Sequence, residues 1–143
     1  ADEYIKAYFA KHAAVKEFMD EQVKFCKANG YVSTLLGRKR FIKEINASAY
    51  MVKQVGERLA MNTPIQGSAA DIIKLAMIKV FRALRDQGLR SRLQVQDELI
   101  INSREEEKEQ VEKLLTENME SAYELAVKLK ADLNEGESWY ELK

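Results

Sequence analysis

Residues 93–100 have the sequence LQVQDELI, in which two neighbouring acidic residues stand between two apolar stretches. Apolar and polar residues alternate over the first four positions, as in a half-buried β-strand. We expect residues 99–101 to form the antiparallel partner of this strand, with Asp97 and Glu98 at or near the connection. The sequence therefore predicts a β-hairpin that carries the acidic pair.

Most of the remaining chain has the apolar spacing of α-helices. The first helical segment, one helix or two short ones, lies within residues 4–29 and ends at Gly30, because glycine is favourable after a helix. The last helix follows Ser103, which forms a capping box with Glu106, and carries apolar residues from 111 to 125. These segments predict a chain that is mostly helical.

Two further helices are expected at residues 47–61 and 65–84. Pro64 is the single proline of the chain, and the sequence TPIQ that starts at Thr63 has the form of a capping box with proline at the first helical position. We therefore expect one helix to end near Asn62 and a new helix to start after it.

Three more short strands are expected, at residues 31–36, 40–42 and 127–133. The first two flank Gly37 and form a second hairpin, and the third alternates apolar residues with Lys and Asp. A chain of 143 residues is long enough for one domain with a hydrophobic core. The expected fold class is α+β, a single domain with long helices packed on a small antiparallel sheet.

The composition is that of a soluble globular protein rather than a disordered one, with 46% hydrophobic and 32% charged residues. No apolar run approaches the length that spans a bilayer, so no membrane partner is expected. The single Cys26 excludes an internal disulfide framework and is typical of a reducing compartment, which predicts a cytoplasmic location. The chain starts at Ala1 without an initiator Met, so we expect that an upstream segment was removed.

The charge is balanced overall, with 23 basic and 23 acidic residues and a formal net charge of zero. This balance is a poor global signature for a nucleic-acid-binding protein, because counterion release requires clustered Lys and Arg. The distribution is more informative. Residues 37–40 have the dense basic sequence GRKR, whereas acidic residues gather at 105–107 and 134–137. The segregation allows a basic face opposite an acidic one.

The acidic pair Asp97 and Glu98 is the strongest chemical signal in the chain. Acidic residues are poor strand formers and cost free energy near a core unless they are paired or bound to a metal. A hairpin tip presents carboxylates rigidly, which suits a hard cation such as Mg²⁺. An ordinary acidic turn is the alternative, and chemistry alone favours it. Successive strand residues also point to opposite faces, and a two-metal site needs carboxylates from more than one segment.

The sequence QVQDEL at residues 94–99 resembles motif C of family A DNA polymerases, usually written QVHDEL. Other stretches that resemble this family, in the same order, are GYV (30–32), TL (34–35), GRKR (37–40), EIN (44–46), GER (56–58), AMN (60–62), PIQG (64–67), AADI (69–72) and the final Gly136 to Trp139 pattern. The resemblance covers nearly the whole chain. It implies part of the fingers in residues 1–60 and most of the palm in residues 61–143.

By this resemblance, Asp97 is expected to bind the catalytic Mg²⁺, with Glu98 as its acidic catalytic neighbour. Arg58, Asn62 and Gln66 stand at positions expected to contact the primer–template near its growing end. Arg can hold a phosphate or a minor-groove acceptor, while Asn and Gln can read acceptors shared by all base pairs. A polymerase needs such contacts because it must accept every correctly paired sequence.

DNA contacts are also expected at Arg38 and Arg40 of the basic cluster and at Gln96, which occupies the position of the motif C histidine. Glutamine donates a hydrogen bond but lacks the shape and protonation of imidazole. The strand before motif C is about two residues shorter than in the family, a change that preserves its faces because side chains alternate with a period of two. Four other positions depart from the family pattern: Lys43, Ala49, Lys53 and Lys128.

Three of the expected DNA-contacting residues, Arg58, Asn62 and Gln66, also have a structural interpretation. Gln66 completes the capping box at Thr63, and Asn62 satisfies backbone groups at the expected helix break. Arg58 pairs with Glu57 or another nearby acidic residue. Without the resemblance to polymerases, we would favour these structural roles.

Motifs A and B of the family, with its first metal-binding aspartate and its nucleotide-gripping Arg and Lys, do not occur in this sequence. Phosphoryl transfer depends on positioning and on charge neutralisation by metals. We therefore expect the isolated chain to be inactive. In an intact DNA replication and repair polymerase, its partners would be primer–template DNA, a deoxynucleoside triphosphate and the missing polymerase segments.

Two rival hypotheses come from other classes of protein. A non-catalytic DNA-binding module would use the Arg38–Arg40 cluster, and its affinity would fall steeply with salt. A structural or self-associating domain would use apolar surface on the first helix, with Tyr4, Tyr8, Phe9 and Phe18 as candidates for a homo-oligomer contact.

Overall fold

The computed structural model describes residues 2–89 and 98–142. The chain divides into two compact units, Ala1–Ser68 and Ala69–Lys143. Each unit is built mainly of helices, and the first also contains a small antiparallel sheet, so the α+β fold class is confirmed. The assignment of residues 1–60 to fingers and 61–143 to palm stays a prediction.

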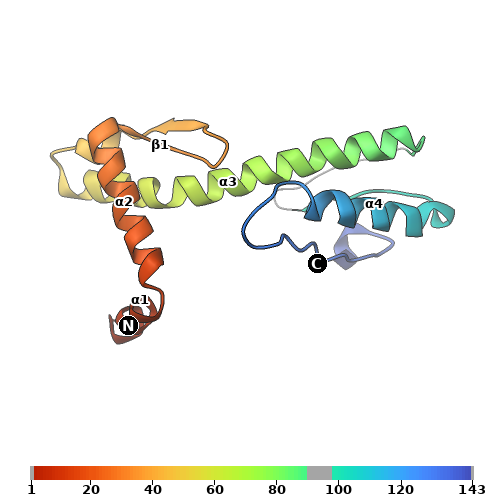
Figure 1. The fold of residues 1–143 in the computed structure, drawn as a ribbon, viewed down its shortest axis with the longest axis horizontal. Coiled ribbons are helices and arrows are strands. Elements are labelled where there is room, and N and C mark those ends of the chain that lie inside the picture. The colour runs from red at the N-terminus through yellow and green to blue at the C-terminus, as the bar shows by residue number, and fades with distance from the viewer. Residues whose placement is uncertain (1, 90–97, 143) are drawn as a thin grey trace. The chain divides into compact units, whose positions relative to one another are not determined.

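The first unit contains two short helices, a two-stranded sheet, a single 3-10 turn and the first part of a long helix (Figure 1). These elements are α1 (Asp2–Lys11), α2 (Ala13–Asn29), β1 (Tyr31–Ser33), β2 (Lys39–Phe41), η1 (Lys43–Asn46) and α3 (Tyr50–Asp86), whose second part belongs to the other unit. Of the two alternatives for the amino-terminal segment, one helix or two, the structure has two, and the predicted hairpin around Gly37 is confirmed. Gly30 ends α2 in the left-handed conformation, with φ of 77°.

The core of the first unit lies between α2, the hairpin, η1 and α3. Its buried members are Cys26, Val32, Ile42, Ile45 and Ala60, with Val23 and Leu59 packed against them. An ion pair at the edge of this core joins α2 to α3, with Lys27 Nζ 2.7 Å from Glu57 Oε1. The hairpin and α2 are therefore fixed to the first part of α3.

The predicted helix break at Pro64 is wrong, because α3 continues through it from Tyr50 to Asp86. Proline lacks a backbone N–H, so the carbonyl of Ala60 loses its usual helical donor. Tertiary packing outweighs this loss: Ala60, Thr63 and Pro64 are all buried. The predicted capping box at Thr63 is consequently wrong as well, since Thr63 lies inside a helix and cannot cap one.

The second unit packs the end of α3 against α4 (Lys108–Glu120). Two single 3-10 turns accompany these helices, η2 (Glu105–Glu107) and η3 (Trp139–Leu142). The buried residues of its core cluster are Val80, Leu84 and Val111, and the half-buried residues around them are Leu89, Leu99, Ile101, Leu114, Leu115 and Met119. No helix within the described ranges is long and apolar enough to cross a membrane.

Three predictions about the second unit are wrong. Residues 99–101 are irregular rather than a strand, and Leu99 and Ile101 pack against the helical core. Residues 127–133 are also irregular, with Val127 78% exposed rather than on a buried sheet face. The last helix ends at Glu120 and not at 125. The predicted strand before Asp97 lies outside the described residues.

The start of the last helix also differs by one residue from the prediction. The carboxylate of Glu107 accepts a hydrogen bond from the backbone N–H of Arg104 at 3.5 Å, so the capping residue is Arg104 and not Ser103. At the other end, Lys79 Nζ donates to the carbonyl oxygen of Ser121, which follows α4. Carbonyl groups at the end of a helix have no donor within the helix, and Lys79 of α3 supplies one for Ser121 at the end of α4.

Candidate nucleic-acid interface

Three polar side chains, Arg58, Asn62 and Gln66, lie along one face of α3, and we call them the polar stripe. Each member is four residues from the next, which on a continuous helix is about 40° around the axis and about 6 Å along it, so the three span about 80°. All three side chains are exposed. Because α3 does not break at Pro64, one continuous helix presents the complete stripe.

The structural roles considered for the stripe do not match the structure. Gln66 completes no capping box, and Asn62 lies at no helix end, because both are in the interior of α3. The ion pair of Glu57 is made with Lys27 of α2. The hydrogen bond from Lys27 lowers the pKa of the Glu57 carboxyl below its usual range.

The β1–β2 hairpin carries the basic cluster to the side of α3. Arg38 and Arg40 are both exposed, and Arg40 pairs with Val32 in the antiparallel register. Arg40 Nη1 donates a hydrogen bond to Thr63 Oγ1 at 3.3 Å. Thr63 directly follows Asn62 on α3 and lies about 100° from it around the helix axis, so Arg40 contacts a neighbouring face of the part of α3 that carries the polar stripe. Arg40, Arg58, Asn62 and Gln66 are thus all exposed on the first unit, and Arg40 is attached to α3 between Asn62 and Gln66 in the sequence.

A neighbouring side chain of the cluster has a different partner. The ammonium of Lys39 lies 4.4 Å from the centre of the Tyr31 ring, and the Tyr31 and Phe41 rings are 5.7 Å apart across the hairpin. A cation above an aromatic face is attracted by the ring quadrupole. These contacts involve β2, the strand that carries Lys39 and Arg40 and directly follows Arg38.

The motif C residues are only partly described. Asp97 and Gln96 lie outside the described residues, and Glu98 is exposed in the second unit. Among the described residues, no group of three or more His, Cys, Asp and Glu side chains could hold a metal ion. The described carboxylates therefore form no metal site by themselves, and the metal-binding role of Asp97 stays a prediction.

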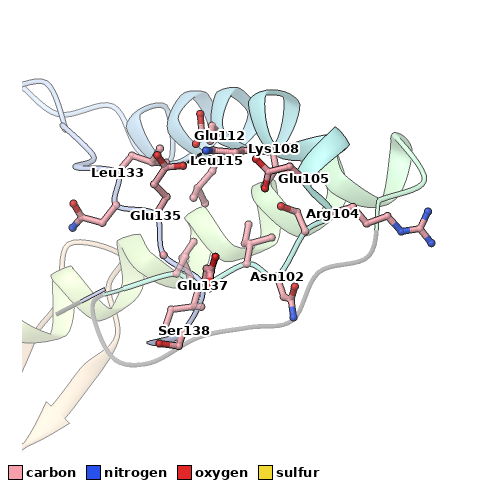
Figure 2. A pocket seen from close by; sticks show the side chains of 17 residues that line it. Asn102, Arg104, Glu105, Lys108, Glu112, Leu115, Leu133, Glu135, Glu137 and Ser138 are labelled. Carbon is pink, nitrogen blue, oxygen red and sulfur yellow. Dashed lines mark ion pairs between the residues drawn. The ribbon is translucent and has the colours of Figure 1, made fainter. Parts of the chain in front are cut away.

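The second unit also has a pocket that the sequence analysis did not predict, with a volume of about 570 Å³ (Figure 2). Its walls come from residues 99–105, from α4 and from residues 133–138. Lys108 of α4 pairs with Glu135 across it, and the hydrogen bond that Lys108 donates to this carboxylate raises the pKa of Lys108. Glu105, Glu112 and Glu137 also line the walls. This excess of carboxylates disfavours a nucleic-acid phosphate, and the described members of the predicted site do not line it.

Comparison with known proteins identifies the chain. The family model described as DNA polymerase family A matches residues 1–141. The chain belongs to DNA polymerase family A. This assignment confirms the resemblance that began with motif C.

Known relatives of family A match the whole chain but are much longer. DNA polymerase I of Caldicellulosiruptor bescii and that of Geobacillus stearothermophilus are each 48% identical over 145 residues, which is 100% of this chain and 17% of theirs. The chain thus spans about one sixth of the length of these curated relatives. A solved structure, the POL domain of Pol1 from M. smegmatis in complex with DNA primer-template and dNTP, is similar with a TM-score of 0.92 and 43% identity. That match covers 96% of this chain and 25% of the other.

Proposed function

We propose that this chain is part of a DNA-directed DNA polymerase and contributes the surface that holds the primer–template. The observation that carries the proposal is the polar stripe, three exposed side chains on one continuous helix of a family A chain. The similar Pol1 structure is a complex with a DNA primer-template and a dNTP, which supports these two partners. The reaction of the intact enzyme would be attack of a primer 3′-hydroxyl on a deoxynucleoside triphosphate.

The residues of the interface have chemically distinct roles in this proposal. Arg58 supplies a charged donor for a phosphate or a minor-groove acceptor. Asn62 and Gln66 are neutral donors that suit the minor-groove acceptors common to A·T and G·C pairs. Arg38 and Arg40 neutralise backbone phosphates beside the stripe. Gln96 would act near the primer terminus in place of the family's histidine.

The catalytic carboxylates of the proposal are Asp97, as a ligand of Mg²⁺, and Glu98 beside it. Bound Mg²⁺ supplies charge neutralisation for phosphoryl transfer. Further ligands and nucleotide-binding groups would come from other polymerase segments, so we expect no activity from the 143-residue chain alone. A cytoplasmic location, with residues 1–60 in the fingers and 61–143 in the palm, completes the proposal.

Two primer-extension experiments test this proposal. The isolated chain with Mg²⁺, primer–template and all four dNTPs should give no extension above background. A chimera in which this chain replaces the matching segment of Geobacillus stearothermophilus DNA polymerase I should extend the primer. Asp97→Ala in the chimera should lower the extension rate by at least about 100-fold, since even residues that only support a metal ligand contribute 10- to 100-fold.

A control variant and two contrary outcomes test separately whether the chain is incomplete and whether it is part of a polymerase. Asp132→Ala, an exposed aspartate outside the proposed site, is the control and should leave extension unchanged. Extension by the isolated chain would overturn the claim that it is incomplete. A folded chimera with no extension would contradict the proposed function itself.

A self-associating domain is a second candidate because α1 exposes large apolar side chains. Tyr4 is 84% exposed, Ile5 54% and Tyr8 52%. Such surface promotes association when a partner is available to cover it. Sedimentation at several concentrations tests this candidate. A monomer at every concentration would contradict it, and a dimer lost in Tyr4→Ser/Tyr8→Ser would support it.

A further inference from the structure

The turn of the β1–β2 hairpin is attached to α3 by a serine hydroxyl that makes two hydrogen bonds. Ser68 Oγ donates to the carbonyl oxygen of Pro64 at 2.5 Å and accepts the backbone N–H of Leu35 at 2.8 Å. A hydroxyl has one proton, so donation to Pro64 leaves its lone pairs for Leu35. The hydroxyl therefore fixes the backbone of the turn at Leu35 to α3 between Pro64 and Ser68.

The turn itself is closed by Thr34. The backbone N–H of Thr34 donates to the Arg38 carbonyl at 2.9 Å, and the N–H of Arg38 donates to Thr34 Oγ1 at 3.2 Å. Gly37, with φ of 79°, supplies the left-handed residue that the turn needs. Thr34 is only 8% exposed, so its side chain faces the protein and not the solvent.

Close packing adds to the hydrogen bonds between turn and helix. A Cβ atom on Gly67 would lie 2.6 Å from Thr34 Cγ2, so the threonine methyl occupies the space that any larger residue at 67 would need. One helical turn earlier, Thr63 accepts the hydrogen bond from Arg40. Three contacts, at Thr63, Gly67 and Ser68, thus fix the hairpin along the same part of α3.

We propose that Ser68 and Thr34 are positioning residues that hold Arg40 beside the polar stripe, so that hairpin and helix bind nucleic acid as one surface. The inference rests on the proposed function. An Arg side chain has large rotamer freedom, and ordering it costs binding free energy unless the protein has already restricted it. The docked turn places the Arg40 backbone, and the Thr63 hydroxyl then orients its guanidinium.

A double-mutant cycle on the 143-residue chain tests the inference. Binding of a fluorescent primer–template duplex is measured by anisotropy at several salt concentrations for the unchanged chain, Ser68→Ala, Arg40→Ala and the double variant. Arg40→Ala should weaken binding about 5- to 10-fold and lower the salt slope by about one. In the Ser68→Ala background the same change should cost less than about twofold, because contacts in one network are not additive.

The salt slope distinguishes positioning from general support of the fold. Ser68→Ala removes no charge, yet it should lower the slope toward that of Arg40→Ala, because Arg40 would no longer neutralise a phosphate. A purely structural serine would leave the slope unchanged. Ser68→Thr keeps the hydroxyl and should keep the slope, and Ser48→Ala, at an exposed serine, is the matched control.

Hydrogen exchange of the Leu35 amide gives a readout without DNA. Exchange should be slow in the unchanged chain and in Ser68→Thr, and faster in Ser68→Ala. Should Ser68→Ala fail to fold by circular dichroism, Thr34→Val gives the same test, since it removes the hydroxyl that accepts from Arg38 and leaves Ser68 in place.

The outcomes separate this inference from the proposed function. Absence of binding by the unchanged chain at low salt contradicts the proposed function and the inference together. Binding with an equal effect of Arg40→Ala in both backgrounds overturns the inference alone. Unchanged exchange of Leu35 in Ser68→Ala also overturns it, because the turn would then be docked without the serine.

Discussion

Gly56 of α3 lies directly against the backbone of Ile45 in η1. A Cβ atom at position 56 would lie 2.6 Å from the Ile45 nitrogen and 2.7 Å from the Glu44 carbonyl carbon. Real Cβ atoms do not approach backbone atoms this closely, and no side-chain rotation relieves the contact because the neighbours are backbone. The glycine therefore permits η1, and with it the buried Ile45, to pack onto the helix.

Gly56→Ala is expected to destabilise the first unit by about 1–3 kcal/mol, the usual cost of overpacking a tight site. The result runs against helix propensity, which alone would favour Ala over Gly inside a helix by about 1 kcal/mol. Urea denaturation followed by circular dichroism measures the change. Gly67→Ala is the matched comparison, because its clash is with the Thr34 methyl and should be relieved by the added change Thr34→Ser. A stabilised Gly56→Ala variant would contradict the close approach.

Leu84→Ala should destabilise the second unit by about 2–5 kcal/mol, the range for deleting a buried leucine side chain. Leu84 is 1% exposed and packs with Val80 and Val111, so its loss leaves a cavity between α3 and α4. Ile78→Ala on the same helix is the control, since Ile78 is 47% exposed and should cost under about 1 kcal/mol. Equal losses in thermal denaturation would show that α4 does not cover this face of α3.

The two units differ in how well the sequence predicted them, and the difference follows from where the determining contacts lie. The hairpin around Gly37 and the stop at Gly30 are local: each needs one glycine with positive φ and a few neighbouring residues. Local chemistry is readable in a single sequence. These elements were therefore predicted correctly, with boundaries displaced by one to three residues.

Pro64 shows how local chemistry fails when packing opposes it. The sequence around Pro64 has the features of a helix start, but Ala60 on one side belongs to the buried core of the first unit. A continuous helix keeps Ala60, Thr63 and Pro64 buried together. The free energy gained by this packing cannot be inferred from the neighbouring sequence. Because the predicted helix break lay at Asn62, the sequence did not indicate that Arg58, Asn62 and Gln66 share one face of a single helix.

The wrong prediction of a strand at residues 127–133 has a different cause from the error at Pro64. Alternation at residues 127–133 predicts a strand face, but a strand also needs a neighbour with which to form hydrogen bonds, and alternation does not identify one. The site residues were predicted from resemblance to a family. Of these, the structure shows exposed positions for Arg58, Asn62 and Gln66, whereas the contacts of Ser68 with Leu35 and Pro64 had no sequence signal.

Cys26 should react slowly with a thiol reagent in the folded chain. Its side chain is fully buried, and burial raises the pKa of the thiol, so both access and the thiolate fraction are reduced. Addition of urea should raise the rate to that of a free cysteine, and Gly56→Ala should raise it at lower urea concentrations. Because Cys26 is the single cysteine of the chain, the measured rate has one source. Fast labelling without urea would contradict its burial.

Acid should remove the stabilising contribution of Glu57. The hydrogen bond from Lys27 lowers the pKa of the Glu57 carboxyl in the folded chain below its value in the unfolded chain, which is about 4.3. The contribution is therefore complete above pH 4.3 and is lost as pH falls through the lowered folded pKa. The side chains of Lys27 and Glu57 are 39% and 33% exposed, so Glu57→Gln should cost only about 0.2–1 kcal/mol at pH 7.

The measurement for Glu57 is urea denaturation of the unchanged chain and Glu57→Gln at pH 7 and again at the lowest pH where both fold. The difference between them should shrink on acidification. Glu17→Gln, at an exposed glutamate of α2, serves as control. A difference that grows as the pH falls would reverse the sign of the linkage and contradict the assigned cause.

Substitutions in the polar stripe should change the salt dependence of duplex binding in different ways. Arg58→Ala removes a charge that is proposed to neutralise a phosphate, so it should weaken duplex binding and lower the salt slope by about one. Asn62→Ala and Gln66→Ala remove neutral donors, so each should weaken binding by a few fold while the slope stays the same. Lys16→Ala, which removes an exposed positive charge from α2, is the matched control for Arg58 and should change neither. An equal loss of slope for Arg58→Ala and Lys16→Ala would mean that DNA responds to the overall charge and not to this face of α3.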